Sequence, residues 1–221
     1  MDIIASIKES FGYATEGLVG KWGRWIVLII GTIIFPLIMG YTLRVMKGIT
    51  PAPETDNYGG MFIDGIKMLI IGIVYMIIPC IIGLIIFVMS GGLGALTMLG
   101  MDVGDPGAYI GLLIGTVGIS FLAFFILAFI FGLFEIIGIM RFARSGSMGS
   151  AFEFSEIFAK IGSIGWVTYI LAIIVLCVVM MVIQIILNVI PVIGWLLSLI
   201  VAPYLSIVGG RYYSLIYDAA D

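Results

Sequence analysis

Residues 68–89 read MLIIGIVYMIIPCIIGLIIFVM, an unbroken run without one charged side chain. A helix of about 20 apolar residues is long enough to cross a hydrocarbon core of about 30 Å. Comparable apolar runs occur at residues 25–43, 109–140, 164–188 and 192–210. This stretch therefore predicts a membrane-spanning helix, and the pattern around it predicts about five spans.

The composition of the chain agrees with a membrane protein. Hydrophobic residues make up 62% of the 221 residues, charged residues 10%, and the mean hydropathy is +1.29. Soluble domains carry about 25% charged residues. We therefore expect an all-α, polytopic helix bundle in the cell membrane, with no sizeable soluble domain. The net charge of −3 is spread over short connections, so no basic face for nucleic acid is expected.

Residues 1–24 form a segment of their own, in which apolar side chains follow one helical stripe. The stripe consists of Ile3, Ile4, Ile7, Phe11, Ala14 and Leu18. The segment predicts an amphipathic helix with two possible placements. It could lie in the membrane interface, with Trp22 and Trp25 at headgroup level, or it could pack against the bundle.

Charged residues predict the topology, but they do so with a conflict. Basic side chains gather in two connections and near the N-terminus: Arg44, Lys47, Lys67, Arg141, Arg144 and Lys160 in the connections, and Lys8, Lys21 and Arg24 before the first run. The positive-inside rule places both connections and the C-terminal tail in the cytoplasm. Five spans then put the N-terminus outside, against the charges at Lys8, Lys21 and Arg24. An even number of spans would remove this conflict.

A short motif recurs along the chain as GYTLRVMKG (40–48), GIMRFARSG (138–146) and the fragment GGRYY (209–213). Together with similar amphipathic segments after the first two copies, it predicts a parallel repeat. The units are residues 25–108 and 109–191, followed by a last span and cytoplasmic tail at 192–221. We expect the basic residues of the motif to mark cytoplasmic helix ends and to contact lipid headgroups: Arg44, Lys47, Arg141, Arg144 and Arg211.

Residues 22–180 resemble an uncharacterised multi-pass membrane family, common in archaea, that is known only as a domain of unknown function. The resemblance rests on GYTLRVMKGITPAPETDNYGGMFIDGIKMLIIGIVYMIIP (40–79), with weaker support from FARSGSMGSAFEFSEIFAKIG (142–162). It implies an all-helical membrane domain. It implies no established activity, substrate or catalytic residue.

Polar side chains within the apolar runs are few. Glu135 lies in the third run, where an ionisable group is a functional candidate by default. It could equally form a structural pair with a base such as Arg211. Gln184 and Asn188 share one helical face, and could line a polar seam or form hydrogen bonds across helices.

Glycines recur along the start of the third run, at Gly107, Gly111, Gly115 and Gly118. Rows of small residues let helix backbones approach each other closely in lipid. The row predicts a helix-packing face, either within the chain or between copies of it.

Residues suited to catalysis are scarce. The chain has no histidine, its two cysteines (Cys80 and Cys177) lie in separate apolar runs, and no phosphate-binding glycine loop occurs. We therefore expect no enzymatic activity, no metal and no cofactor. The first hypothesis is a structural or scaffolding protein that binds membrane lipids and self-associates or anchors a membrane-protein partner. The alternative is a small transporter or channel for an apolar or weakly polar substrate.

Overall fold

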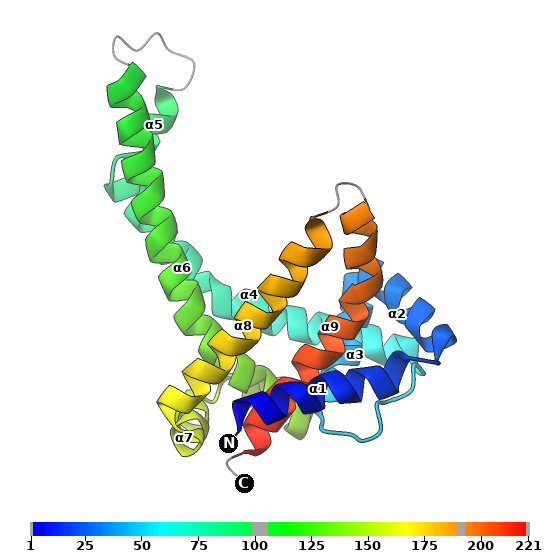
Figure 1. Ribbon diagram of the computed structural model, residues 1–221. Coiled ribbons are helices and arrows are strands. Elements are labelled where there is room, and N and C mark those ends of the chain that lie inside the picture. Colours follow the sequence, from blue (N-terminus) through cyan, green and yellow to red (C-terminus); the bar gives the residue numbers. More distant parts are fainter. Residues whose placement is uncertain (1, 99–105, 190–192, 220–221) are drawn as a thin grey trace. The chain divides into compact units, whose positions relative to one another are not determined.

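The computed structural model describes residues 2–98, 106–189 and 193–219, and these residues contain helices as their only regular elements (Figure 1). The elements are α1 (Ile3–Leu18), α2 (Trp22–Ile33), α3 (Phe35–Met46), α4 (Tyr58–Met89), α5 (Gly92–Thr97), α6 (Pro106–Ser145), the short 3-10 helix η1 (Met148–Phe152), α7 (Phe154–Ile164), α8 (Trp166–Asn188) and α9 (Ile193–Asp218). They form two compact units. Unit 1 holds residues 1–71 and 134–221, and unit 2 holds residues 72–133.

The described helices confirm the predicted all-helical membrane fold. Four of them are long and apolar enough to cross a membrane, namely α4, α6, α8 and α9. The 23 residues of α8 correspond to a length of about 35 Å at 1.5 Å per residue. The chain is thus a membrane protein with four candidate spanning helices.

The predicted first span at 25–43 is wrong as a single crossing. The segment forms α2 and α3, which are 12 residues each and are separated at Ile34, whose φ and ψ are −90° and 75°. Pro36 explains the break, because proline donates no backbone hydrogen bond and its ring clashes with the carbonyl group four residues earlier in a continuous helix. Each helix is about 18 Å long, which is too short for a hydrocarbon core of about 30 Å.

The two ends of this broken segment lie together, which shows that the chain turns back. In the first turn of α2, Nη1 of Arg24 donates to the carbonyl oxygen of Ala52, which follows α3, at 3.4 Å. The hydroxyl of Tyr13 likewise donates to the carbonyl oxygen of Ile49 at 2.7 Å. A segment whose ends touch cannot cross the membrane once. With four crossing helices the termini lie on one side, so the conflict in the charges of the N-terminal segment disappears.

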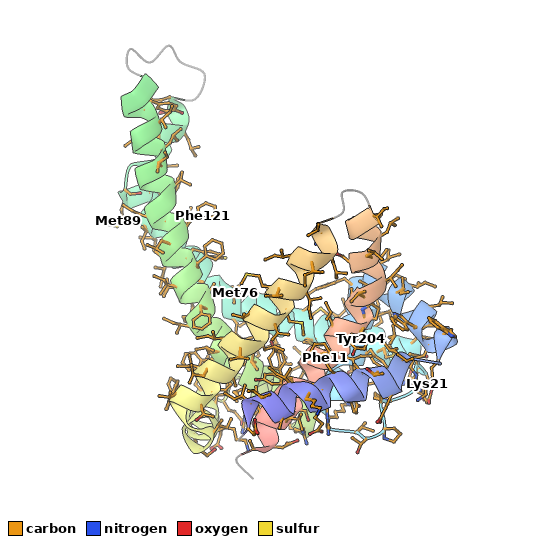
Figure 2. All side chains as sticks on the ribbon, viewed as in Figure 1. Phe11, Lys21, Met76, Met89, Phe121 and Tyr204 are labelled. Carbon is orange, nitrogen blue, oxygen red and sulfur yellow. The ribbon has the colours of Figure 1, made fainter. Side chains whose placement is uncertain are left out.

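Helix α1 begins at an N-cap, where Oδ1 of Asp2 accepts hydrogen bonds from the amides of Ile4 and Ala5, each at 3.0 Å. It packs against α9, and its placement relative to the membrane interface stays a prediction. Figure 2 shows Phe11 and Tyr204 next to each other, with ring centroids 6.0 Å apart. The Tyr204 hydroxyl also donates to the carbonyl oxygen of Phe11 at 3.1 Å.

The core of unit 1 is built around α9, which contacts α1, α2, α3, α7 and α8. The buried cluster draws side chains from α1, α2, α3, the start of α4 and α9: Tyr13, Leu18, Leu28, Ile38, Tyr41, Met61, Ile207 and Val208. Helices α3 and α4 approach through two glycines. An added Cβ on Gly40 would overlap the carbonyl oxygen of Met61, and one on Gly65 would overlap that of Pro36.

Unit 2 is a helical hairpin made of residues 72–89 of α4, the short helix α5 and residues 106–133 of α6. Its helices come close at Gly83, where an added Cβ would lie 3.3 Å from Cβ of Phe124. The Tyr109 hydroxyl donates to the carbonyl oxygen of Ala95 at 3.2 Å. Thr116 and Ser120 are buried, and each hydroxyl donates to a carbonyl of its own helix. Residues 99–105, with Asp102 and Asp105, lie outside the described residues.

Candidate functional site: an arginine layer in unit 1

All five arginines of the chain lie in unit 1, and each contacts a carboxylate. The pairs are Arg24–Glu54, Arg44–Asp56, Arg141–Glu153, Arg144–Asp218 and Arg211–Glu9. We call these ten residues the arginine layer. It joins the ends of α3, α6 and α9 with α1 and with the connections that follow α3 and α6.

Arg44, in the last turn of α3, holds the connection at residues 49–57. Its Nη1 donates to Oδ1 of Asp56 at 2.7 Å and to the carbonyl oxygen of Asp56 at 2.9 Å, and Nη2 donates to the carbonyl oxygen of Asn57 at 3.3 Å. Tyr41 adds a hydrogen bond to the carbonyl oxygen of Pro53 at 2.8 Å. These contacts tie the exposed loop to the end of α3.

Arg141, in the last turns of α6, likewise holds the connection that follows its helix. Its Nε donates to the carbonyl oxygen of Ser150 at 3.1 Å, and its guanidinium pairs with Glu153 and, at 3.8 Å, with Glu156. In both copies of the motif the acidic partner follows the arginine at the same separation along the chain, as Asp56 follows Arg44 and Glu153 follows Arg141. The two pairs share this spacing, and the repeat itself stays a prediction.

The ends of the two helices agree in backbone conformation as well. Gly48 after α3 has a φ of +78° and Gly146 after α6 has a φ of +74°. Such values favour glycine, which ends helices in this conformation at little steric cost.

Arg144 connects three helix ends. Its Nε donates to the carbonyl oxygen of Met46 at 3.1 Å, and its Nη2 donates to Oγ of Ser214 and to both carboxylate oxygens of Asp218, each at 2.8 Å. The last carbonyls of a helix have no partner within it and carry a partial negative charge. The guanidinium therefore satisfies the end of α3 while it binds α9. Gly48 gives it room, because an added Cβ there would lie 3.0 Å from Nη2.

Arg24 and Arg211 are the more deeply buried members of the layer. The side chain of Arg24 is 5% exposed, and its Nη1 donates to the carbonyl oxygen of Gly17 at 3.0 Å. The side chain of Arg211 is 12% exposed, pairs with Glu9 at 2.5 Å and lies 4.9 Å from the ring centroid of Tyr13. Burial raises the pKa of Tyr13 above its usual value, although the nearby guanidinium of Arg211 acts in the opposite direction. The neutral phenol is the form that donates to Ile49.

The predicted headgroup residues therefore share one location and differ in their contacts. Protein groups engage Arg44, Arg141, Arg144 and Arg211, whereas Lys47 is exposed at the end of α3. Contact with lipid headgroups stays a prediction for all of them. The acidic partners were missed in the sequence, although their shared spacing could have revealed two of them.

The intramembrane polar residues do not form one group. Glu135 lies near Tyr213, whereas Arg211, its predicted partner, pairs with Glu9 instead. The expected pair between Glu135 and Arg211 is therefore wrong, because Glu9 of α1 pairs with Arg211. Gln184 and Asn188 are exposed two to three turns further along α8 than Cys177. The Asn188 amide donates to the carbonyl oxygen of Gln184 at 2.8 Å, so this hydrogen bond stays within one helix.

The glycine row lies on an exposed face of α6. Gly107, Gly111, Gly115 and Gly118 are exposed, and an added Cβ at Gly111, Gly115 or Gly118 would have no described heavy atom within 4 Å. The neighbouring Thr116 and Ser120 are buried instead. Within the described residues, no group of three or more histidine, cysteine, aspartate or glutamate side chains could hold a metal ion.

Comparison with known proteins places the chain in a family. The family model described as "Protein of unknown function (DUF4013)" matches residues 25–192, and the chain belongs to this family. The matched range covers α3 and the pairs Arg44–Asp56 and Arg141–Glu153. It includes Arg144 but not its partner Asp218. No curated protein and no solved structure matches the chain.

The hydrogen bonds between Arg44 and the connection at residues 49–57 lead to a testable expectation. In Arg44→Gln the carbonyl oxygens of residues 54–57 lose their charged donor, at a cost of about 1–2 kcal/mol in local stability. Amide hydrogen exchange of residues 49–61 should accelerate by roughly tenfold in the full-length protein, since about 1.4 kcal/mol corresponds to a factor of ten. Lys47→Gln, which removes an exposed charge close by, serves as the control. Equal exchange in both variants would show that Arg44 does not hold the loop.

Proposed function

We propose that this protein is a structural or scaffolding protein of the plasma membrane, which self-associates in the bilayer. The exposed glycine row on α6 carries the proposal. Gly111, Gly115 and Gly118 leave open space where a second helix backbone could approach, and none of the described residues fills it. In lipid, where burial of apolar surface gives little drive, close backbone packing of this kind is a main source of helix association.

The charges of unit 1 fit the same function. The five guanidinium groups are all paired within the chain, so the arginine layer stiffens unit 1 rather than offering a charged path for a solute. A rigid polar layer beside exposed apolar helices suits a protein that anchors or arranges others. By the positive-inside rule this layer faces the cytoplasm, where Lys47 can contact anionic headgroups.

The alternative of a small transporter or channel has weaker support. A hydrophilic path needs its polar side chains on a common face. Gln184 and Asn188 are exposed on α8, and the Asn188 amide donates to a backbone carbonyl of its own helix. We assign no catalytic role, because the arginine layer consists of paired charges without a nucleophile and its base.

The proposal is tested by counting copies in membranes. Full-length protein with a fluorescent tag is extracted with its native lipids, and photobleaching steps are counted in single particles. We expect two or more copies per particle, and Gly115→Leu should reduce the associated fraction at least tenfold by blocking backbone approach. Gly94→Leu on α5, another glycine whose added Cβ meets no described atom, should leave the count unchanged. A strictly single-copy wild-type protein would overturn the proposal.

A further inference from the structure

Helix α7 in unit 1 has an apolar face that is only partly covered by protein. Ile157 and Ile161 are fully buried, where α7 contacts α8 and α9. Phe154 and Phe158 lie four residues apart and so share one side of the helix, beside the two isoleucines. They are 45% and 47% exposed. The helix therefore presents two large aromatic side chains away from the core of its own unit.

The side of α7 opposite these phenylalanines is polar. Glu156 and Ser163 are exposed there, and Oε2 of Glu156 lies 3.8 Å from Nη1 of Arg141. Lys160 follows between the polar side and the buried side, with its ammonium group 4.4 Å from the ring centroid of Tyr217. This side of α7 suits contact with water, next to the arginine layer.

The exposed aromatic side of α7 continues into the start of α8. The ring centroid of Phe158 lies 5.7 Å from that of Trp166 and 4.8 Å from that of Phe134 in α6. Trp166 is the first residue of α8, and it is 39% exposed. The next residue, Val167, is 72% exposed. The rings thus join the exposed side of α7 to the outer surface of a candidate membrane-spanning helix.

The start of α8 sets the level of α7 relative to a membrane. The 23 residues of α8 span about 35 Å, slightly more than a hydrocarbon core of about 30 Å, so Trp166 comes close to the boundary of the core. Tryptophan is enriched at this level of membrane proteins. Gly165 ends α7 one residue before α8, with a φ of +93° and a ψ of 119°, and α7 does not continue the line of α8 (Figure 1).

We propose that α7 lies along the membrane interface, with Phe154 and Phe158 inserted among the upper acyl chains of phospholipids and Trp166 at headgroup level. Lipid is the partner that fits this side, because the side is continuous with the outer surface of a spanning helix. The three sides of α7 then face protein, lipid and water, as expected for an interfacial helix. The inference holds for a single copy and does not depend on the proposed self-association.

The depth of nitroxide labels tests this placement. Phe154→Cys and Ser163→Cys are made singly in full-length protein with Cys80→Ser and Cys177→Ser. Each variant is labelled and reconstituted as a single copy per nanodisc of phosphatidylcholine and phosphatidylglycerol. The accessibility of each label to oxygen, which concentrates among acyl chains, is divided by its accessibility to a water-soluble nickel chelate. We expect this ratio to be about threefold or more higher at residue 154 than at residue 163, since the apolar face of an interfacial helix lies about 5–10 Å into the boundary of headgroups and acyl chains.

Val178→Cys, exposed near the middle of α8, gives the reference ratio for the hydrocarbon core. The ratio at residue 154 should lie below this reference, because an interfacial helix does not reach the centre of the bilayer. Equal ratios at residues 154 and 163 would overturn the proposal, and so would a ratio at residue 154 equal to the core reference. A label at residue 154 that neither reagent reaches would show that protein covers this side, which would also contradict it.

Discussion

Gly65→Ala is expected to prevent unit 1 from folding normally. The ideal Cβ of residue 65 would overlap the carbonyl oxygen of Pro36, and it would also lie 3.0 Å from the amide nitrogen of Gly40. Both obstacles are backbone atoms, so no side chain can rotate away to make room. Helices α3 and α4 would have to separate along the whole crossing.

Separating these helices is costly because their crossing lies in the core. Met61, Tyr41 and Ile38 are buried beside it and would lose contacts together. Inserting atoms into a packed core costs about 1–3 kcal/mol, and more where backbone must move, so we expect about 3 kcal/mol or more. Gly40→Ala should behave in the same way, since its Cβ would overlap the carbonyl oxygen of Met61.

The effect can be measured as the thermal unfolding midpoint and the monodisperse yield of the full chain in mild detergent. Gly59→Ala provides the matched control, because it lies in the first turn of the same helix and its Cβ meets no described atom within 4 Å. We expect the control to match the wild type. Equal stability of Gly65→Ala and Gly59→Ala would show that α3 and α4 do not cross at this point.

Arg144→Met is expected to be the most harmful single loss within the arginine layer. The change removes the donor for Met46, Ser214 and Asp218 at once, and so it disconnects the ends of α3, α6 and α9. Removing one partner of a fully buried ion pair costs about 3–5 kcal/mol. The side chain of Arg144 is 32% exposed, so solvent screening lowers our expectation to about 2 kcal/mol.

The loss in unfolding free energy is measured by denaturing the full-length variant in detergent while its tryptophan fluorescence is recorded. Lys47→Met is the control, because it removes one positive charge from the exposed end of α3. Added salt should lower the unfolding free energy of the wild-type protein only slightly, since partly buried ion pairs are screened less than exposed ones. If Arg144→Met lowers the unfolding free energy by less than about 0.5 kcal/mol, the ion pairs of the arginine layer act as surface pairs with little effect on stability.

The helical membrane fold could be predicted from the sequence because apolar run length and charge are local properties. The turn at Ile34 could not be predicted in the same way, since a long apolar run looks alike whether it crosses or turns back. Pro36 was present as a signal, but spanning helices tolerate proline when neighbours satisfy the freed groups. The charges of Lys21 and Arg24 were the better signal, because they agree with an even number of spans.

The roles of the arginines show a second limit of sequence analysis. Their positions at helix ends were visible, but the identity of their partners depends on contacts between distant segments. Arg211 meets Glu9 across 202 residues, and Arg144 meets Met46 across 98. Arg44 and Arg141 could have been matched with acids, because those partners follow at a short and shared spacing.

We infer that α2 and α3 form a hairpin on one side of the membrane, so that α1 and the end of α3 share that side. Cysteine accessibility in intact cells tests it most directly, with Lys8→Cys, Lys47→Cys and Met98→Cys made singly in the Cys80→Ser, Cys177→Ser background. Lys8→Cys and Lys47→Cys should react with a membrane-impermeant maleimide only after permeabilisation, while Met98→Cys, beyond the crossing part of α4, should react in intact cells. Labelling of Lys8→Cys and Lys47→Cys from opposite sides would contradict the account.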